Sequence, residues 1–225
     1  IVDGSGQPGY TGDVALEGGR IVEVGGKAGP ARREIDANGL LVTPGWVDAH
    51  THYDGQATWD SELAPSSWHG VTTVLFGNCG VGFAPVRHRD HESLIGLMEA
   101  VEEIPGIALA EGLKWNWETF PQYLDALDQM PRAIDVAAQI PHHPLRVYVM
   151  GERAINREKA TGDDIAAMRD AVRAGLEAGA FGFTTSRTNS HKTPTGDMVP
   201  GRYSEVEELL GIGSAFKGLG YGAFG

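Results

Sequence analysis

Two histidines and a cysteine are the residues of this chain whose types and spacing suggest chemistry. His50 and His52 are separated by one residue in "VTPGWVDAHTHYDG" (42–55), and Cys79, the only cysteine among 225 residues, ends the apolar run "VTTVLFGNC". Side chains at positions i and i+2 of a strand point to the same face, so we expect the two imidazoles to project together. Imidazole and thiolate are ligands that zinc and related ions prefer. The pattern therefore favours a metal site formed by these three side chains.

Each of the three residues also has an ordinary structural interpretation. A His-x-His pair on a strand is commonly unrelated to metal, and a lone buried cysteine usually packs as a small hydrophobic residue. The residue types alone leave both interpretations open. What favours the metal site is that all three residues come at strand ends, because that end of a βα barrel carries the active site.

From residue 40 onward, expected strands alternate with expected helices. Apolar runs typical of strands cover residues 40–50, 71–78, 134–140, 145–151, 180–186 and 221–225. Helical spacing of apolar residues predicts helices over 91–104, 119–130, 161–179 and 204–218. Capping boxes at Thr119-x-x-Gln122 and Ser204-x-x-Glu207 support two of these helices.

This alternation predicts an α/β fold with βα units around a parallel sheet. Residues 1–41 differ, because three short alternating runs separated by glycines predict a small β-rich segment there. A closed eight-stranded barrel takes about 250 residues. We therefore expect two domains, a β segment over 1–41 and an incomplete (β/α) barrel over 42–225.

Composition excludes some classes of partner. The net charge of −12 and the isoelectric point near 5.0 argue against nucleic acid, which binds to basic patches. No apolar run approaches the roughly 18 residues that a membrane span needs. A single cysteine cannot form an internal disulfide, so a cytoplasmic setting is expected. Because residue 1 is Ile and the last residues resemble the start of a strand, we expect a piece of a longer protein.

The chain resembles a known enzyme superfamily in several segments. "DVALEGGRIVEVG" followed by "IDANGLLVTPGWVDAHTHYD" is similar to the entry of the amidohydrolase superfamily, a small β-sandwich leading into the first barrel strand and its His-x-His pair. "GVTTVLFGNCGVGFAP" resembles, more narrowly, the D-aminoacylase (N-acyl-D-amino-acid deacylase) branch. "WETFPQYLDALD", "DVAAQIPHHPLRVYVMG" and "GAFGFTTS" match that branch in the same order.

The resemblance implies a metal-dependent (β/α)8 barrel of the TIM type that hydrolyses a linear amide bond in N-acyl-D-amino acids, with one or two zinc ions as cofactor. It assigns Cys79 to the tightly held zinc and His50 and His52 to a more weakly held metal position. The remaining histidine ligands and the general-base Asp are expected beyond residue 225. The implied partner is a small N-acyl amino acid, and the oligomeric state stays open.

Two further residues are candidates for substrate contact. His142 aligns with a family histidine in the loop after the third strand, and Arg187 follows the fourth strand, where a guanidinium suits a carboxylate. Two other functions stay open. One is a non-catalytic homologue with a degraded metal site, and the other is a cyclic-amide (dihydropyrimidinase-like) hydrolase. The latter uses a carbamylated lysine on strand four, where "FGFTTSRT" has none.

Overall fold

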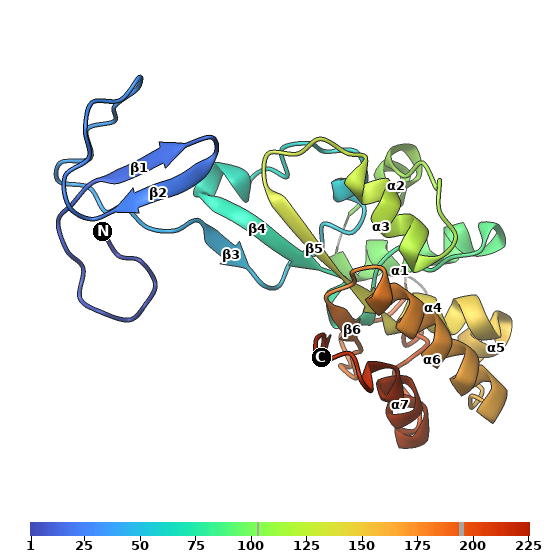
Figure 1. Ribbon diagram of the computed structural model, residues 1–225. Coiled ribbons are helices and arrows are strands. Elements are labelled where there is room, and N and C mark those ends of the chain that lie inside the picture. Colours follow the sequence, from blue (N-terminus) through green and yellow to red (C-terminus); the bar gives the residue numbers. More distant parts are fainter. Residues whose placement is uncertain (103, 194–195) are drawn as a thin grey trace. The chain divides into compact units, whose positions relative to one another are not determined.

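The computed structural model describes residues 1–102, 104–193 and 196–225 in two compact units (Figure 1). The first unit is Ile1–Trp46 and the second is Val47–Gly225. The three candidate metal ligands all belong to the second unit.

The first unit contains a β-hairpin. Strands β1 (Val14–Glu17) and β2 (Arg20–Val24) pair antiparallel, with a bulge in β1. Gly18 and Gly19 form the turn with φ of 58° and 76°, the left-handed region that glycine adopts at little cost. The third expected strand, "REIDANG" (33–39), does not form in the structure. The β-sandwich implied by the resemblance stays a prediction.

The second unit is built on one five-stranded sheet. Its strands are β3 (Trp46–Asp48), β4 (Val71–Phe76), β5 (Asp135–Pro141), β6 (Gly182–Thr184) and β7 (Ala223–Phe224), in that spatial order. The three pairs β4–β5, β5–β6 and β6–β7 are all parallel. Figure 1 shows β4 and β5 side by side. Strands in chain order with parallel pairing are those of an incomplete βα barrel, as the sequence predicts.

Helices connect the strands of this sheet. They are α1 (His91–Glu102), α2 (Gly106–Gly112), α3 (Phe120–Asp128), α4 (His142–Met150), α5 (Glu152–Ile155), α6 (Gly162–Glu177) and α7 (Val206–Gly213). The helix expected over 91–104 is α1, although residue 103 lies outside the described residues. Short 3-10 turns follow several strands, including Asn78–Gly80 after β4.

The strand expected over 145–151 is wrong, because these residues belong to α4. Valine and tyrosine in "LRVYVMG" favour a strand locally. Pro144, however, falls in the first turn of α4, where its missing N–H leaves no bond unmade. The segment also lies between the parallel strands β5 and β6, which need a helical crossover. Tertiary context overrides the local preference.

The capping box at Thr119 and Gln122 forms as the sequence predicts. The box expected at Ser204 does not form, because Glu205 is the N-cap of α7 and accepts no side-chain bond. The Ser204 hydroxyl donates instead to the Gly201 carbonyl at 2.9 Å. Its backbone is part of the connection that enters α7, one residue too early to cap it.

Helix α6 packs directly against the centre of the sheet. Met168, Val172 and Leu176 recur along one helix face and are fully buried. A Cβ on Gly175 would lie 2.6 Å from Ile140 Cδ1 in β5. Glycine at this position therefore allows the close approach of helix and strand that encloses the core.

Helix α6 also has a capping box that allows a direct test of its stability. The Thr161 hydroxyl accepts from the Asp164 backbone N–H at 3.2 Å, and the Asp164 carboxylate accepts from the Thr161 N–H at 2.8 Å. We predict that Thr161→Ala lowers the free energy of unfolding by about 1 kcal/mol in urea titrations, because a helical N–H loses its partner. Thr161→Ser keeps the hydroxyl and should stay close to wild type. Equal losses in both variants would contradict a capping role.

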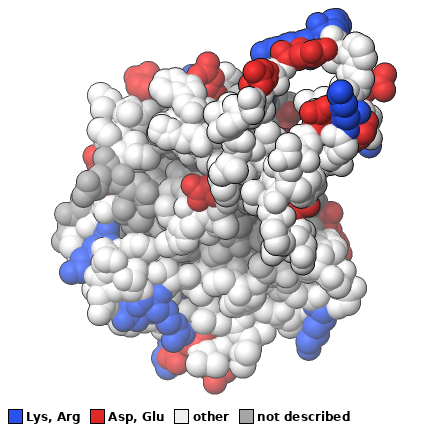
Figure 2. All heavy atoms as spheres, turned by 90° about the vertical axis from the view of Figure 1, so that its left-hand side faces the viewer, with Lys and Arg blue, Asp and Glu red and all other residues white. Residues whose placement is uncertain are grey.

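Charged side chains on the face shown in Figure 2 lie in small separate groups among uncharged atoms. Within the described residues, no helix combines the length and the apolar character needed to cross a membrane.

Candidate metal centre

The side chains of His50, His52 and Cys79 come together in the structure. One ligand atom of each residue, a ring nitrogen or the sulfur, lies within 4.8 Å of the other two. Cys79 Sγ is 3.4 Å from His50 Nε2, and the two imidazole centroids are 5.5 Å apart. Zn–S and Zn–N bonds of about 2.3 and 2.05 Å at a tetrahedral angle separate two ligand atoms by about 3.6 Å. The donor set and its spacing therefore fit a zinc-like ion.

Backbone ties between neighbouring strands hold the two histidines near the cysteine. Thr51, between the histidines, donates to the Leu75 carbonyl through its N–H at 3.0 Å and its hydroxyl at 2.9 Å. The side chain of Asn78 donates to the Thr51 carbonyl at 3.2 Å, and its oxygen accepts from Gln139 at 2.9 Å. One asparagine thus links the histidine segment, the cysteine turn and β5.

Cys79 occupies a tight turn with an unusual backbone. Its φ of 56° is left-handed, as are those of Gly77 (80°) and Gly80 (70°). A Cβ on Gly77 would lie 2.1 Å from the Gln139 carbonyl oxygen, so only glycine fits there. The Thr184 hydroxyl in β6 accepts from the Gly80 N–H at 3.1 Å and donates to the Gly77 carbonyl. The turn is thereby tied to β5 and β6, and the thiol is set beside the histidine pair.

His52 is held in the form that binds metal. Burial, with smaller effects from His50 and His191, lowers the pKa of His52 to about 4. The imidazole is therefore neutral at neutral pH, and a neutral imidazole is the form that coordinates metal.

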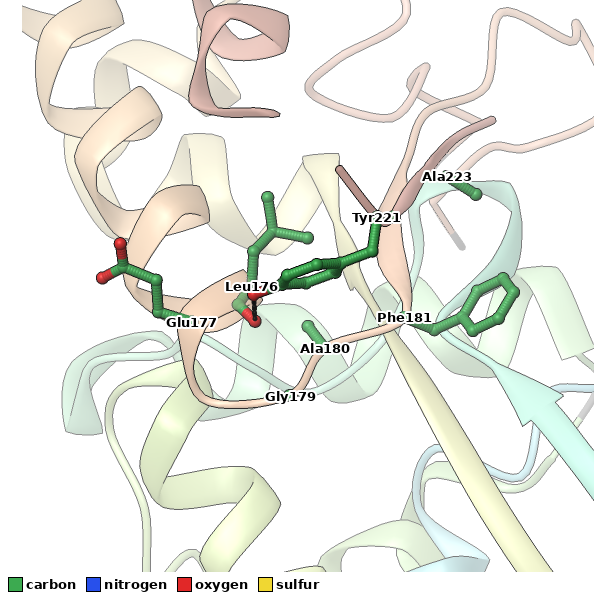
Figure 3. A pocket seen from close by; sticks show the side chains of 8 residues that line it. Leu176, Glu177, Gly179, Ala180, Phe181, Tyr221 and Ala223 are labelled. Carbon is green, nitrogen blue, oxygen red and sulfur yellow. Dashed lines mark hydrogen bonds between the residues drawn. The ribbon is translucent and has the colours of Figure 1, made fainter. Parts of the chain in front are cut away.

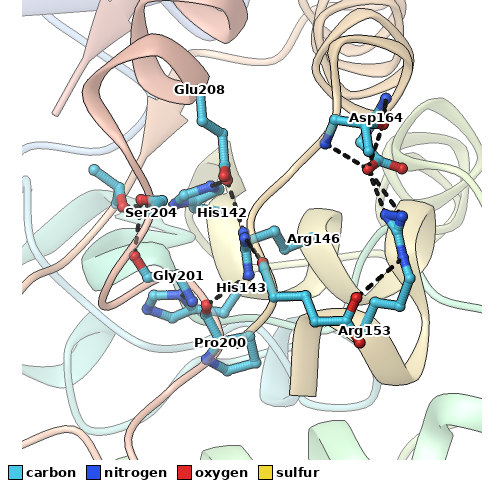
Figure 4. Close-up of polar contacts among 12 residues, drawn as sticks. His142, His143, Arg146, Arg153, Asp164, Pro200, Gly201, Ser204 and Glu208 are labelled. Atoms are coloured by element: carbon cyan, nitrogen blue, oxygen red, sulfur yellow. Dashed lines mark hydrogen bonds and ion pairs between the residues drawn. The ribbon is translucent and has the colours of Figure 1, made fainter. Parts of the chain in front are cut away.

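The structure places His142 at the start of a helix and not in a loop, and its contact with substrate stays a prediction. His142 begins α4 and is fully buried. Its Nε2 lies 2.8 Å from Glu208 Oε1, and its Nδ1 lies 2.8 Å from Thr185 Oγ1 (Figure 4). Both ring nitrogens are thus engaged within the protein. Because a carboxylate can only accept, Nε2 carries the proton of the neutral ring and Thr185 donates to Nδ1.

Glu208 and Arg146 form a buried ion pair beside this histidine. Arg146 Nε is 2.8 Å from Glu208 Oε1, and the two side chains are 3% and 2% exposed. The remaining guanidinium nitrogens donate to the carbonyls of Pro200 at 2.9 Å and Glu158 at 2.8 Å. Burial alone would raise the pKa of Glu208, but the hydrogen bonds from His142 and Arg146 hold it below its ordinary value. The connection between β5 and β6 and the connection between β6 and β7 therefore meet at one buried charge pair.

Arg187 follows β6, as the sequence predicts, and its residue is exposed. One guanidinium nitrogen donates to the Ser204 carbonyl at 2.6 Å. This bond orients the side chain and leaves other N–H groups for a ligand, since a guanidinium carries five. Carboxylate binding by Arg187 stays a prediction.

Because His142 is buried and neutral, we predict that it makes the free energy of unfolding depend on pH. Burial, with smaller contributions from Arg146 and Arg187, lowers its pKa despite the opposing effect of Glu208. The unfolded chain therefore takes up this proton first as the pH falls below about 6.5, so the free energy of unfolding contributed by His142 falls with it. In chelator-treated protein, the loss between about pH 7.5 and pH 5.5 should be smaller in His142→Gln than in wild type. Equal losses, or a larger loss in the variant, would contradict a buried neutral His142.

A hollow of about 490 Å³ lies elsewhere on the second unit. It is bordered by the end of α6 and by the residues that lead into β6 and β7, including Leu176, Ala180 and Tyr221 (Figure 3). The Tyr221 hydroxyl donates to the Leu176 carbonyl across it at 3.1 Å. The metal cluster follows the carboxyl ends of β3 and β4, whereas this hollow adjoins the amino ends of its strands. It is not part of the candidate metal centre.

The sheet and the three-donor cluster are those of an incomplete βα barrel with a candidate metal centre. Residues 33–219 match the model of the amidohydrolase family, and the chain belongs to that family. A D-aminoacylase of Alcaligenes xylosoxydans xylosoxydans is 35% identical over 186 residues, covering 82% of this chain and 36% of the relative. An N-acyl-D-aspartate deacylase of the same organism is 38% identical, covering 82% and 34%. The resemblance to the D-aminoacylase branch is confirmed.

Solved structures agree with the sequence relatives. A D-aminoacylase structure described by the role of its binuclear metal centre superposes with a TM-score of 0.79 at 33% identity, covering 99% of this chain and 42% of that one. N-acyl-D-glutamate deacylase of Bordetella bronchiseptica, complexed with zinc and a phosphonate inhibitor, gives 0.73 at 31% identity, covering 95% and 40%. The chain thus spans about two-fifths of the length of these proteins.

The residues that hold the cluster together were harder to find from the sequence than its ligands. Asn78 and Thr51 are adjacent to the cysteine and the histidines, so their proximity is a usable signal. Glu208 gives no such signal, because its partner His142 lies 66 residues away and glutamate in the first turn of a helix is ordinarily solvent-exposed.

Proposed function

We propose that the complete protein is a metal-dependent hydrolase that removes the acyl group from N-acyl-D-amino acids. The observation that carries this proposal is the convergence of His50, His52 and Cys79, in a chain 35% and 38% identical to two deacylases of that kind. Zinc is the proposed metal, since two imidazoles and a thiolate suit its borderline-soft character. A lone ligand thiol also persists best in a reducing compartment, and we propose the cytoplasm.

The residues of this chain would bind the metal and fix its position. Cys79 would be a thiolate ligand, and His50 and His52 would offer neutral ring nitrogens. Bound zinc would lower the pKa of a water toward neutrality and polarise the amide carbonyl. Hydrogen bonds of Asn78 and Thr51 tie the histidine segment to the end of β4, so the donors are already close together before a metal binds.

The proton transfers would need a general base, and none of the site residues named above is assigned that role. The resemblance implies an Asp on a later strand, which would take the proton of the attacking water and return it to the leaving amine. Arg187 is our candidate for the carboxylate of the amino acid, because its guanidinium follows β6 at the same end of the sheet as the metal cluster.

The test is hydrolysis of a matched panel by the complete zinc-loaded protein. We expect release of free amino acid from N-acetyl-D-amino acids, including D-Asp and D-Glu, and much slower release from the L-enantiomers. Activity should disappear with a chelator and return with zinc. Bound zinc without hydrolysis of any panel member would instead indicate a non-catalytic homologue. Hydrolysis of dihydrouracil, but not of the linear amides, would indicate a cyclic-amide hydrolase.

A further inference from the structure

His143 has no place in the proposed chemistry, yet it is the buried histidine nearest to the cysteine turn. It is the second residue of α4 and is 0% exposed. Its ring lies between two backbone segments. A Cβ on Gly201 would lie 2.6 Å from His143 Nδ1, and one on Gly80 would lie 3.2 Å from His143 Nε2. The ring therefore occupies space that is open only because residues 80 and 201 are glycines.

One hydrogen bond fixes the tautomer of this ring. The Gly201 backbone N–H donates to His143 Nδ1 at 3.0 Å (Figure 4). A backbone amide can only donate, so Nδ1 is unprotonated and the proton of the neutral ring is on Nε2. Burial holds the pKa of His143 well below its ordinary value, and the neighbouring His142 and His191 act in the same direction. The ring is therefore neutral, with one acceptor and one donor in known positions.

The donor side of the ring faces the cysteine turn. The backbone of Cys79 is the neighbouring group that raises the pKa of His143, as expected for a polar group facing the protonated Nε2. Among the described residues, Nε2 makes no hydrogen bond of standard geometry. Direct metal ligation by Nε2 would require the proton to move to Nδ1, where the Gly201 N–H already points. The ring can therefore act on the site through the backbone of Cys79 and not as another ligand.

We propose that His143 is a positioning residue for the Cys79 ligand, bracing the left-handed Cys79–Gly80 turn against the segment that contains Gly201. The inference rests on the proposed metal site for its effect on metal binding. It deepens that site by adding a partner that keeps the thiol in place. Gly201, which lies in the same connection as Arg187, is thereby linked through His143 to the metal ligand.

Two substitutions test the acceptor side and the donor side of the His143 ring separately. In His143→Asn, the side-chain oxygen reaches the position of Nδ1 and can still accept from Gly201, but the donor toward Cys79 is lost. In His143→Gln, the amide nitrogen reaches the position of Nε2 and keeps that donor, but the acceptor for Gly201 is lost. The two variants are matched in polarity and differ in which side of the ring they replace.

The first readout is cobalt(II) titration of the complete protein, followed by the thiolate-to-cobalt charge-transfer band. We expect cobalt affinity to fall about 10–100-fold in His143→Asn, the range for loss of an outer-shell partner, and to change less than about threefold in His143→Gln. A similar fall in both variants, or no fall in His143→Asn, would overturn the proposal. If His143→Asn does not fold, a tenfold or larger fall in His143→Gln alone overturns it.

The second readout needs no metal. In chelator-treated protein, we expect Cys79 to be alkylated several-fold faster in His143→Asn than in wild type or His143→Gln, with a Cys79→Ala protein as the background. Equal rates in all three would overturn the brace. Failure of wild type to bind cobalt, with the alkylation difference intact, would contradict the proposed metal function and leave the role of His143 standing.

Discussion

Cys79→Ala in the complete protein is expected to remove tightly bound zinc and to lower kcat/KM for an N-acetyl-D-amino acid by roughly 100-fold or more, beyond the 10–100-fold typical for loss of an outer-shell partner. The reason is that the variant loses the anionic donor of the three-residue cluster and keeps two neutral imidazoles. Without the thiolate, the protein binds the zinc dication more weakly. A smaller fraction of the protein then has a metal-bound water that can attack the substrate at neutral pH. Zinc content after dialysis and steady-state kinetics measure the two effects.

Val81→Ala is the matched control for that substitution. Val81 is fully buried two residues from Cys79 but has no group that could bind a metal. It should lower stability by roughly 1–3 kcal/mol through loss of packing while zinc content stays close to wild type. Retention of zinc and activity in Cys79→Ala would contradict a ligand role for the thiol. Equal zinc loss in Val81→Ala would mean that the turn, and not the sulfur, is what matters.

Glu208→Gln is expected to destabilise the protein by about 3–5 kcal/mol, because it leaves the buried guanidinium of Arg146 without its counter-ion. A single carboxylate oxygen, Oε1, is 2.8 Å from both Arg146 Nε and His142 Nε2. The glutamine amide keeps one acceptor oxygen but no charge, so the hydrogen bonds cannot replace the ion pair. Urea unfolding of the complete protein, monitored by circular dichroism, gives the change in free energy.

The neighbouring residue supplies the control. Glu207→Gln makes the same chemical change on the same helix, at an exposed position. It should alter the free energy of unfolding by no more than about 0.5 kcal/mol. If both variants behave alike, the Arg146–Glu208 pair contributes little net stability and the network around His142 is not a structural centre.

The ligand cluster could be predicted from the sequence because it depends on short-range rules. The expected strand ends at Asp48 in the structure, so His50 and His52 lie just beyond β3 and not on a strand face. Their separation by a single residue still keeps the two rings close, with centroids 5.5 Å apart. The end of the next parallel strand places Cys79 at the same edge, so two local patterns and one topological rule were enough. The capping box of α3 was predictable for the same reason, since Thr119 and Gln122 interact within one helical turn.

The features that sequence reasoning missed depend on distant partners. Residues 145–150 form part of a helix because the crossover between β5 and β6 requires one, although valine and tyrosine favour a strand locally. His142 is buried because Glu208 meets it from a helix far along the chain. His143 is defined by two glycines on separate segments, Gly80 and Gly201. No local periodicity encodes such pairings.

Anomalous diffraction at the zinc edge, on crystals of the complete zinc-loaded protein, tests the central claim most directly. We predict anomalous density bonded to Cys79 Sγ at about 2.3 Å, and density within about 2.0–2.1 Å of a ring nitrogen of His50 and of His52, from one ion or from two adjacent ions. Zinc density at full occupancy elsewhere, with none at these three side chains, would contradict the assignment of this cluster as the metal centre.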